Sequence, residues 1–135
     1  MLALTLVGDR IIRGPGIAWQ PFTDELLASA RREGRPVIID FTAAWCTPCR
    51  QLEDETCHSK KVVDPATESF TMVKVDLTSS GASLNERLLR EYAVKGVPTI
   101  VFIGADGREH RALRLADYLP ADDFLARMQA TQLTW

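Results

Sequence analysis

The stretch PVIIDFTAAWCTPC, residues 36–49, decides the fold. Its first part, Pro36–Phe41, is a short apolar run rich in β-branched residues, which predicts a central strand buried on both faces. Two cysteines with C-x-x-C spacing follow, Cys46 and Cys49. The residues from Thr47 to about His58 predict a helix. We therefore expect a strand, a short loop and a helix, with the cysteine pair at the start of the helix.

Similar signals continue on both sides of this stretch. On the N-terminal side, Thr23 can cap a helix that Gly34 ends, so Thr23–Glu33 is a predicted helix. Beyond the cysteines we expect an irregular helical stretch over Ser59–Ser69 that Pro65 breaks, and then a strand over Phe70–Leu77. A capping box at Ser83–Glu86 opens the next predicted helix, which runs to Tyr92, and a strand follows over Thr99–Ile103. We expect a turn at Asp106-Gly107 with a return strand over Arg108–Leu115, and a last helix from about Pro120. This order predicts an α/β fold with a mixed sheet and helices on both faces.

The overall composition fits one domain and excludes several classes. The chain has 135 residues and a net charge of −2, and Glu33 and Gly34 interrupt its one dense basic run at residues 31–35, so we expect no nucleic-acid partner. No apolar run approaches the ~20 residues of a membrane-spanning helix, and Met1–Val7 is too short for an export signal. We expect residues 1–16 to be a leader or linker, or a short strand on the domain edge, and residues 17–135 to form the domain.

The spacing of the cysteines points to redox chemistry. Three cysteines are too few and odd in number for a structural disulfide framework. A cysteine at a helix start is favoured as a thiolate, and a second one three positions later can resolve a mixed disulfide. Zinc is the alternative, but the other candidate ligands, Cys57 and His58, lie ~12 Å along the predicted helix from Cys49. We therefore expect no metal, and no cofactor other than a redox-active Cys46–Cys49 disulfide.

Two carboxylates and one further cysteine are candidates near this pair. Asp40 is the charged residue of an otherwise apolar strand, where desolvation raises a carboxyl pKa; it either trades protons with a thiol or is a strand-end Asp bonded to backbone. Glu53, one helical turn after Cys49, is either a second proton-handling group or a solvated helix residue. For Cys57 we favour a buried, inert thiol over a third redox thiol. Trp19 has no motif around it and is assigned to packing.

Two motifs resemble the thioredoxin superfamily. Residues 40–49 resemble the thioredoxin active-site segment, and Gly96–Thr99 resembles the family's loop with a cis-proline. Within the superfamily, residues 19–130 are most similar to the C-terminal periplasmic domain of the DsbD-type thiol–disulfide interchange proteins. That similarity rests on softer features: residues 34–37, 49–53 and 75–78 and the turn at 106–107.

The resemblance implies a thioredoxin fold and a role for each catalytic position. Cys46 would be the attacking, substrate-exposed thiol, and Cys49 the resolving one. Asp40 and Glu53 would tune the protonation of the two thiols. The dipeptide between the cysteines, Thr47-Pro48, differs from the common thioredoxin dipeptide and leaves the reduction potential open.

The same resemblance supplies a substrate-binding surface. Pro98 would be cis, and Val97 would offer backbone groups to a substrate. Trp45, Thr47 and Pro48 complete the residues that we expect to contact substrate, with purely structural packing as the alternative for Trp45.

These expectations favour a protein-disulfide reductase with thiol or disulfide proteins as partners. Its electron donor would be a membrane domain, which implies a monomeric periplasmic domain excised from a membrane-tethered protein. The alternatives are a free-standing cytosolic thioredoxin served by a thioredoxin-type reductase, and a non-catalytic thioredoxin-fold binding module.

Overall fold

The computed structural model describes residues 5–7, 10–12, 15–79 and 82–133. Its centre is a four-stranded sheet with the order β3 (Gln20–Pro21), β5 (Thr71–Asp76), β4 (Val37–Thr42), β6 (Thr99–Ile103). Strands β3 and β4 run parallel to β5, whereas β6 is antiparallel to β4. Two short strands, β1 (Thr5–Val7) and β2 (Arg10–Ile12), pair with each other in antiparallel orientation. The predicted mixed sheet is therefore confirmed.

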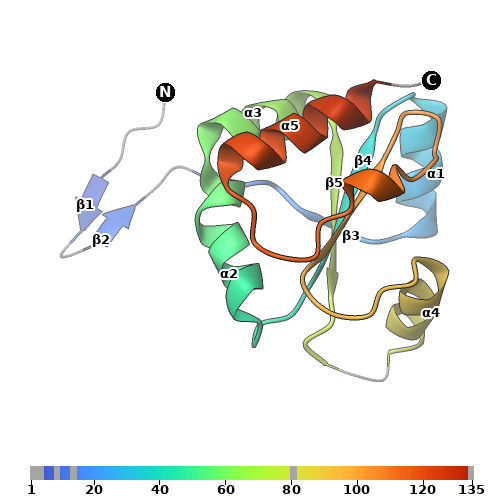
Figure 1. The fold of residues 1–135 in the computed structure, drawn as a ribbon, viewed down its shortest axis with the longest axis horizontal. Coiled ribbons are helices and arrows are strands. Elements are labelled where there is room, and N and C mark those ends of the chain that lie inside the picture. The colour runs from blue at the N-terminus through green and yellow to red at the C-terminus, as the bar shows by residue number, and fades with distance from the viewer. Residues whose placement is uncertain (1–4, 8–9, 13–14, 80–81, 134–135) are drawn as a thin grey trace.

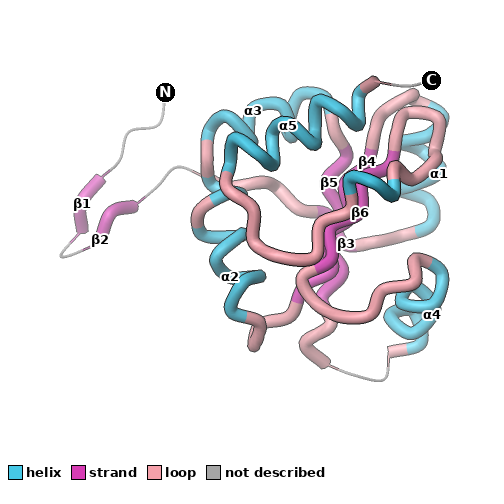
Figure 2. The backbone as a smooth tube through the Cα atoms, viewed as in Figure 1, coloured by secondary structure: helices cyan, strands magenta, loops and turns pink. Residues whose placement is uncertain are grey.

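Helices cover both faces of this sheet (Figures 1 and 2). They are α1 (Asp24–Arg32), α2 (Thr47–Asp54), α3 (Lys60–Ser69), α4 (Ser83–Glu91) and α5 (Ala121–Gln132), with two short 3₁₀ helices, η1 (Thr56–His58) and η2 (Arg111–Leu113). In Figure 1, α1 and α4 lie on one side of the sheet, and α2, α3 and α5 lie on the other. Among the described residues, no helix is long and apolar enough to cross a membrane.

Alternation along the strands divides the buried side chains into two clusters. On β4, Ile39 and Phe41 pack with residues of α1 and α4, whereas Ile38 packs with residues of α2, α3 and α5. Successive side chains of a strand point to opposite faces, so one buried strand supplies both clusters. The even-numbered positions of β4 and β5 share the face that α2 covers, which places Asp40 there.

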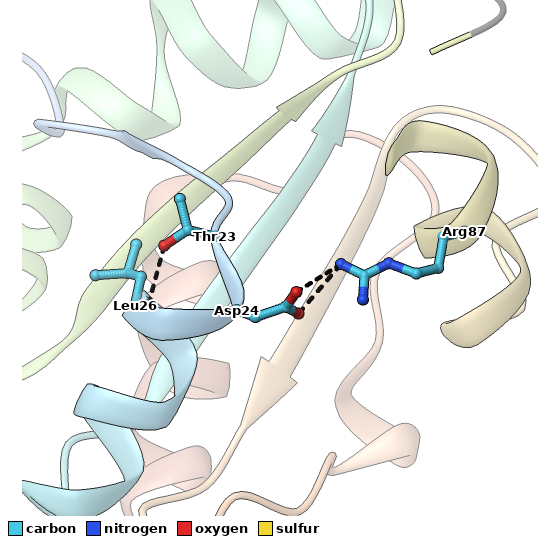
Figure 3. A network of polar contacts seen from close by, with 4 residues as sticks. All are labelled: Thr23, Asp24, Leu26 and Arg87. Carbon is cyan, nitrogen blue, oxygen red and sulfur yellow. Dashed lines mark hydrogen bonds and ion pairs between the residues drawn. The ribbon is translucent and has the colours of Figure 1, made fainter. Parts of the chain in front are cut away.

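The first helix begins and ends as the sequence predicts. The Thr23 hydroxyl accepts a hydrogen bond of 3.0 Å from the Leu26 amide, and Gly34 takes a positive φ of 67° just after the helix. Figure 3 shows this cap together with Asp24, which pairs with Arg87 of α4 at 2.9 Å. The cap satisfies a helix-end amide that has no partner within the helix.

Three helix predictions are wrong in detail. The helix predicted from Thr47 to His58 ends at Asp54 and is followed by the separate turn η1, because the backbone of Glu55 leaves regular helical geometry at ψ −66° with φ −104°. Pro65 does not break α3, which runs through it while Val62 and Ala66 bury one side of the helix. Ser83 forms no capping box: the cap residue is Ala82, and no side chain caps this helix.

The predicted return strand over Arg108–Leu115 is also wrong. The turn is present, with Gly107 at a φ of 84° and its amide bonded to the Gly104 carbonyl at 2.9 Å. After the turn, only two isolated bridges to β6 form, and η2 lies between them. Because the 3₁₀ turn diverts the backbone, a continuous ladder cannot form. The expected boundary at residue 17 stays a prediction, since much of 1–16 lies outside the described residues.

Candidate active site

The cysteine pair sits at the N-terminus of α2, where the chain leaves β4. Cys46 is the N-cap residue of this helix, and its sulfur accepts a hydrogen bond of 3.3 Å from the amide of Cys49. The two sulfurs are bonded, and the Cα atoms are 5.2 Å apart, within the usual range for a disulfide. An amide donor and the positive end of the helix favour negative charge at the Cys46 sulfur once the bond is reduced.

The cysteine pair is almost fully enclosed. Cys46 and Cys49 are each 5% exposed in this disulfide-bonded state, and the role of Cys46 as the substrate-exposed thiol stays a prediction. Ala43 and Val97 pack against the two residues and account for this burial. Trp45 lies beside them and is 67% exposed, which makes it a large apolar side chain on the surface next to the disulfide.

The loop before β6 faces the disulfide. The Val97–Pro98 peptide bond is cis, as the resemblance implies, and Pro98 is buried. The Thr99 hydroxyl donates to the Gly96 carbonyl at 2.7 Å and closes the loop on itself. A shallow pocket of about 270 Å³ lies along residues 95–99. The expected surface residues Thr47 and Pro48 lie on the first turn of α2, exposed and half-buried respectively.

The hydrogen bonds of Thr78 hold the loop that leads to Cys46. The hydroxyl of Thr78 accepts a hydrogen bond of 2.8 Å from the Ala44 amide and donates to the Asp76 carboxylate. Hydrogen bonds from Thr78 lower the pKa of Asp76. The end of β5 thereby holds the loop that carries Trp45 and Cys46.

Asp40 is buried in β4, on the face that α2 covers. Burial raises the pKa of this carboxyl from 3.8 to about 7; Lys74 lowers it and Glu53 raises it. Its strand register places Lys74 of β5 directly beside it. A carboxyl group with a pKa near 7 exchanges its proton at neutral pH, which is the property that general acid–base catalysis needs.

Glu53 lies on α2 and is held by two contacts. Its carboxylate accepts a hydrogen bond of 3.3 Å from the Trp19 indole, and the Lys74 ammonium is 3.7 Å from the same oxygen. Glu53 is thus a half-buried, paired group, and the interpretation of a simple solvated helix residue is wrong. Because Lys74 pairs with Glu53 and neighbours Asp40 in the strand register, the structure brings the two predicted carboxylates to the same side of the sheet.

Cys57 lies in η1, the 3₁₀ helix that follows α2 along the chain. It is buried, and its pKa is raised by this burial, with further contributions from Asp40 and Glu53. A raised pKa disfavours the thiolate, which supports the predicted inert thiol. The neighbouring His58 uses its Nδ1 for the Glu53 carbonyl, at 2.6 Å. Within the described ranges, no group of three or more His, Cys, Asp or Glu side chains is placed to hold a metal ion.

Three residues of the site were missed by sequence reasoning: Trp19, Lys74 and Thr78. Lys74 carries a usable signal, because it is a charged residue between two valines of an otherwise largely apolar strand, much as Asp40 is in β4. Trp19 carried none, since its partner Glu53 lies 34 positions away in the sequence. Thr78 lies beyond the end of β5, and only the strand register places it beside Ala44.

Comparisons with known proteins agree with this geometry. A family model described as thioredoxin-like matches residues 18–105. The thiol:disulfide interchange protein DsbD 2 of Pseudomonas aeruginosa is 38% identical over 109 residues, which are 81% of this chain and 18% of that protein. DsbD of Yersinia pestis is 32% identical over 102 residues, 76% of this chain and 17% of that protein. The chain thus spans less than a fifth of the length of these curated relatives.

Solved structures show the same fold. The thioredoxin of Thermus thermophilus superposes with a TM-score of 0.70 at 27% identity, covering 86% of this chain and 87% of that one. The oxidised C-terminal domain of DsbD from Neisseria meningitidis gives 0.67 at 24% identity, covering 85% of this chain and all of that one. On the agreement of fold, cysteine pair and family match, this chain belongs to the thioredoxin-like family.

Proposed function

We propose that this chain is a protein-disulfide reductase that passes electrons through Cys46 and Cys49 to partner proteins. A C-x-x-C pair in a thioredoxin-like domain with DsbD relatives supports thiol–disulfide oxidoreductase activity. One observation carries the assignment of roles: the Cys46 sulfur caps α2 and accepts the Cys49 amide at 3.3 Å. That donor stabilises a thiolate on Cys46, and the attacking species in thiol–disulfide exchange is the thiolate.

The reaction is two successive exchanges. The Cys46 thiolate attacks one sulfur of a partner disulfide, forms a mixed disulfide and releases the other partner sulfur as a thiolate. The Cys49 thiolate then attacks the Cys46 sulfur, so the Cys46–Cys49 disulfide forms and the second partner thiolate leaves. Two electrons pass from the dithiol to the partner, and the two released thiolates take up protons.

Asp40 serves the second exchange. Cys49 must lose its proton before it can attack, and Cys49 is buried. A carboxylate with a pKa of about 7 is a suitable acceptor for that proton at neutral pH. Glu53 and Lys74 act on the same proton through their charges.

The partner surface is the exposed edge around the disulfide. Trp45 offers apolar area, and Thr47 lies exposed at the helix start. Val97 packs against the cluster of Ala43, Cys46 and Cys49, which supports a partner chain laid along residues 95–99, next to the disulfide. The edge of this loop suits an extended peptide segment that pairs with backbone groups of Val97.

The DsbD relatives support a proposal for the electron donor and for the compartment. We assign the chain to the periplasm as a monomeric domain that a membrane-embedded electron donor reduces. The resemblance to the DsbD-type C-terminal domain and the 38% identity to DsbD 2 support this assignment. Reduction of the purified chain by a thioredoxin-type flavoprotein reductase, together with recovery of the full-length gene product from the cytosol, would instead favour a free-standing thioredoxin.

The first test is the equilibrium reduction potential of the pair, titrated against dithiothreitol and glutathione buffers. A value near that of thioredoxin, about −270 mV, or moderately above it supports a reductase. A value approaching that of DsbA, about −120 mV, means that the chain is an oxidant and contradicts the proposal.

Variants then separate the two cysteine roles. Cys46→Ser should abolish reduction of a model protein disulfide, because no attacking thiolate remains. Cys49→Ser should instead trap the mixed disulfide, which is visible as a covalent adduct. Cys57→Ala is the matched control and should keep the wild-type rate. Full loss of activity in Cys57→Ala would show that the third thiol takes part in the exchange.

A further inference from the structure

Trp19 is the residue that joins the N-terminal part of the domain to the charged groups of the site. It lies just before β3, is half-buried and packs against the cluster under α2, α3 and α5. Its indole N–H donates to the Glu53 carboxylate at 3.3 Å, across 34 positions of sequence. The neighbouring Ile17 amide donates to the Cys57 carbonyl at 3.0 Å, which anchors this segment against η1.

The same indole contacts the other charge of the site. The Lys74 ammonium lies 5.3 Å from the centre of the Trp19 ring, within the range of a cation–π interaction. That ammonium is also 3.7 Å from the Glu53 oxygen to which the indole donates. One side chain therefore contacts both members of an ion pair, the anion by its N–H edge and the cation by its ring face.

The charges of Lys74 and Glu53 both act on the buried carboxyl of Asp40. Lys74 neighbours Asp40 in the strand register, and its charge lowers the pKa of Asp40, while Glu53 raises it. Cys57 of η1 and, once the disulfide is reduced, Cys49 of α2 are further titratable groups on this side, and β6 contributes the apolar Ile100 opposite Asp40. The pKa of Asp40 therefore depends on the positions of the Lys74 and Glu53 charges, since Coulomb energies fall with distance.

We propose that Trp19 is a positioning residue for thiol–disulfide exchange, because it holds Glu53 and Lys74 in the places from which they act on the proton of Asp40. The inference rests on the proposed function, in which Asp40 accepts the proton of Cys49. Among the described residues, Trp19 makes no hydrogen bond to Cys46 or Cys49, and it acts through Glu53 and Lys74. Its role therefore goes beyond the packing expected from the sequence.

The test is the titration of the Asp40 carboxyl, followed by carbon NMR in the disulfide-bonded protein, which requires no exchange activity. Trp19→Phe keeps an aromatic ring but loses the N–H donor. Of the two charges, Lys74 has the larger effect on the pKa of Asp40. Trp19→Phe should loosen the Lys74–Glu53 pair and so raise the midpoint of the Asp40 titration by roughly half a pH unit. Lys74→Met should raise it further, and Glu53→Gln should lower it.

Coupling between the variants separates positioning from packing. If Trp19 places Lys74, then Lys74→Met should shift the midpoint less in the Trp19→Phe protein than in the wild type. Equal shifts in both proteins, or no shift in Trp19→Phe, would overturn the proposal. Tyr118→Phe is the matched control: it removes an aromatic donor to Glu55 at 3.1 Å, at the end of the same helix, and should leave the Asp40 midpoint unchanged.

A wild-type measurement keeps the proposal testable if Trp19→Phe folds poorly. The indole N–H resonance of Trp19 should shift with the same midpoint as Asp40, because its acceptor Glu53 is coupled to that carboxyl. An indole resonance that is flat across the Asp40 titration would overturn the proposal. The exchange assay stands apart from both results: an inactive protein with coupled titrations would refute the proposed function and leave the placement of the charges intact.

Discussion

The two faces of the central sheet are built from alternate residues of the same strands, yet they differ in chemistry. Under α1 and α4, Ile39 and Phe41 of β4 meet Val73 and Val101 in a cluster of apolar side chains. Under α2, Ile38 is followed by Asp40, with Lys74 beside it. A step of one residue along β4 thus separates an apolar face from a face that carries a buried carboxyl with a raised pKa. We expect substitutions on the two faces to differ in their dependence on pH.

Asp40→Asn should give the largest change in stability, and only at high pH. Because the pKa of Asp40 rises from 3.8 to about 7 on folding, the folded protein keeps a proton that the unfolded chain releases. The unfolding free energy therefore falls as the pH rises through this window. At about 1.4 kcal/mol for each pKa unit, the cost above neutral pH is about 4 kcal/mol. Asparagine removes this cost, so urea unfolding should show a gain of that order near pH 8 and little near pH 4.

The control for this prediction is Asp76, whose pKa shifts in the opposite direction on folding. Asp76 is an exposed carboxylate whose pKa is lowered by its hydrogen bonds from Thr78. It adds stability that is present at neutral pH and lost as the pH falls through its folded pKa. Asp76→Asn should therefore be slightly destabilising at neutral pH and neutral in acid. A gain for Asp40→Asn that is the same at every pH would show that the carboxyl does not titrate differently in the folded state.

Leu88→Ala probes the apolar face and should be costly at every pH. Leu88 of α4 is fully buried, at 0% exposure, in the cluster that contains Phe41. Truncation of a buried leucine costs about 3 kcal/mol through lost burial and the cavity left behind. Leu84 on the same helix is 39% exposed, so Leu84→Ala is the matched control and should change stability little. The reduction potential of the cysteine pair should stay unchanged in both variants, and a shift in it would couple the two faces.

The reactivity of Cys57 measures how well the face of the sheet under α2 is shielded from solvent. Its thiol is buried and its pKa is raised by burial, so alkylation should proceed only through opening of the structure. We expect iodoacetamide to modify Cys57 far more slowly than reduced Cys46, at a rate that follows unfolding by urea. Cys57→Ala should cost about 1 kcal/mol, the value of a small buried apolar group. Fast alkylation in the native protein would mean that this face is open to solvent.

The sequence predicts the parts of the molecule that local patterns determine. The continuous apolar run before Asp40 predicts β4, and the Thr23 cap predicts the start of α1, because both signals lie within one element. The cysteine pair and the loop at Pro98 were found from motifs for the same reason. The return strand failed because the chain after Gly107 can satisfy its backbone in η2 as well as in a ladder, and tertiary packing decides between them.

The charged part of the site shows the opposite case. Asp40 stood out as one charge in an apolar strand, but its pKa depends on Glu53 and Lys74, which reach it from other elements. The contact of Trp19 with Glu53 spans 34 positions, so no window of sequence contains it. Residues that act through space on a buried group are found only once the register of the strands is known.

The smallest expected effects concern the two polar contacts of Figure 3, the Thr23 cap of α1 and the Asp24–Arg87 ion pair between α1 and α4. Thr23→Ala removes the acceptor for the Leu26 amide, at 3.0 Å, and should cost about 1 kcal/mol at any salt concentration, because a helix-end donor loses its partner. Arg87→Gln breaks an ion pair to Asp24 whose side chains are 42% and 70% exposed, and should cost less than Thr23→Ala, since water and salt screen it. Thr23→Ser keeps the acceptor and should be near wild type. Urea unfolding at low and high salt measures both, and a larger cost for Arg87→Gln would show that the ion pair, rather than the cap, holds α1 against α4.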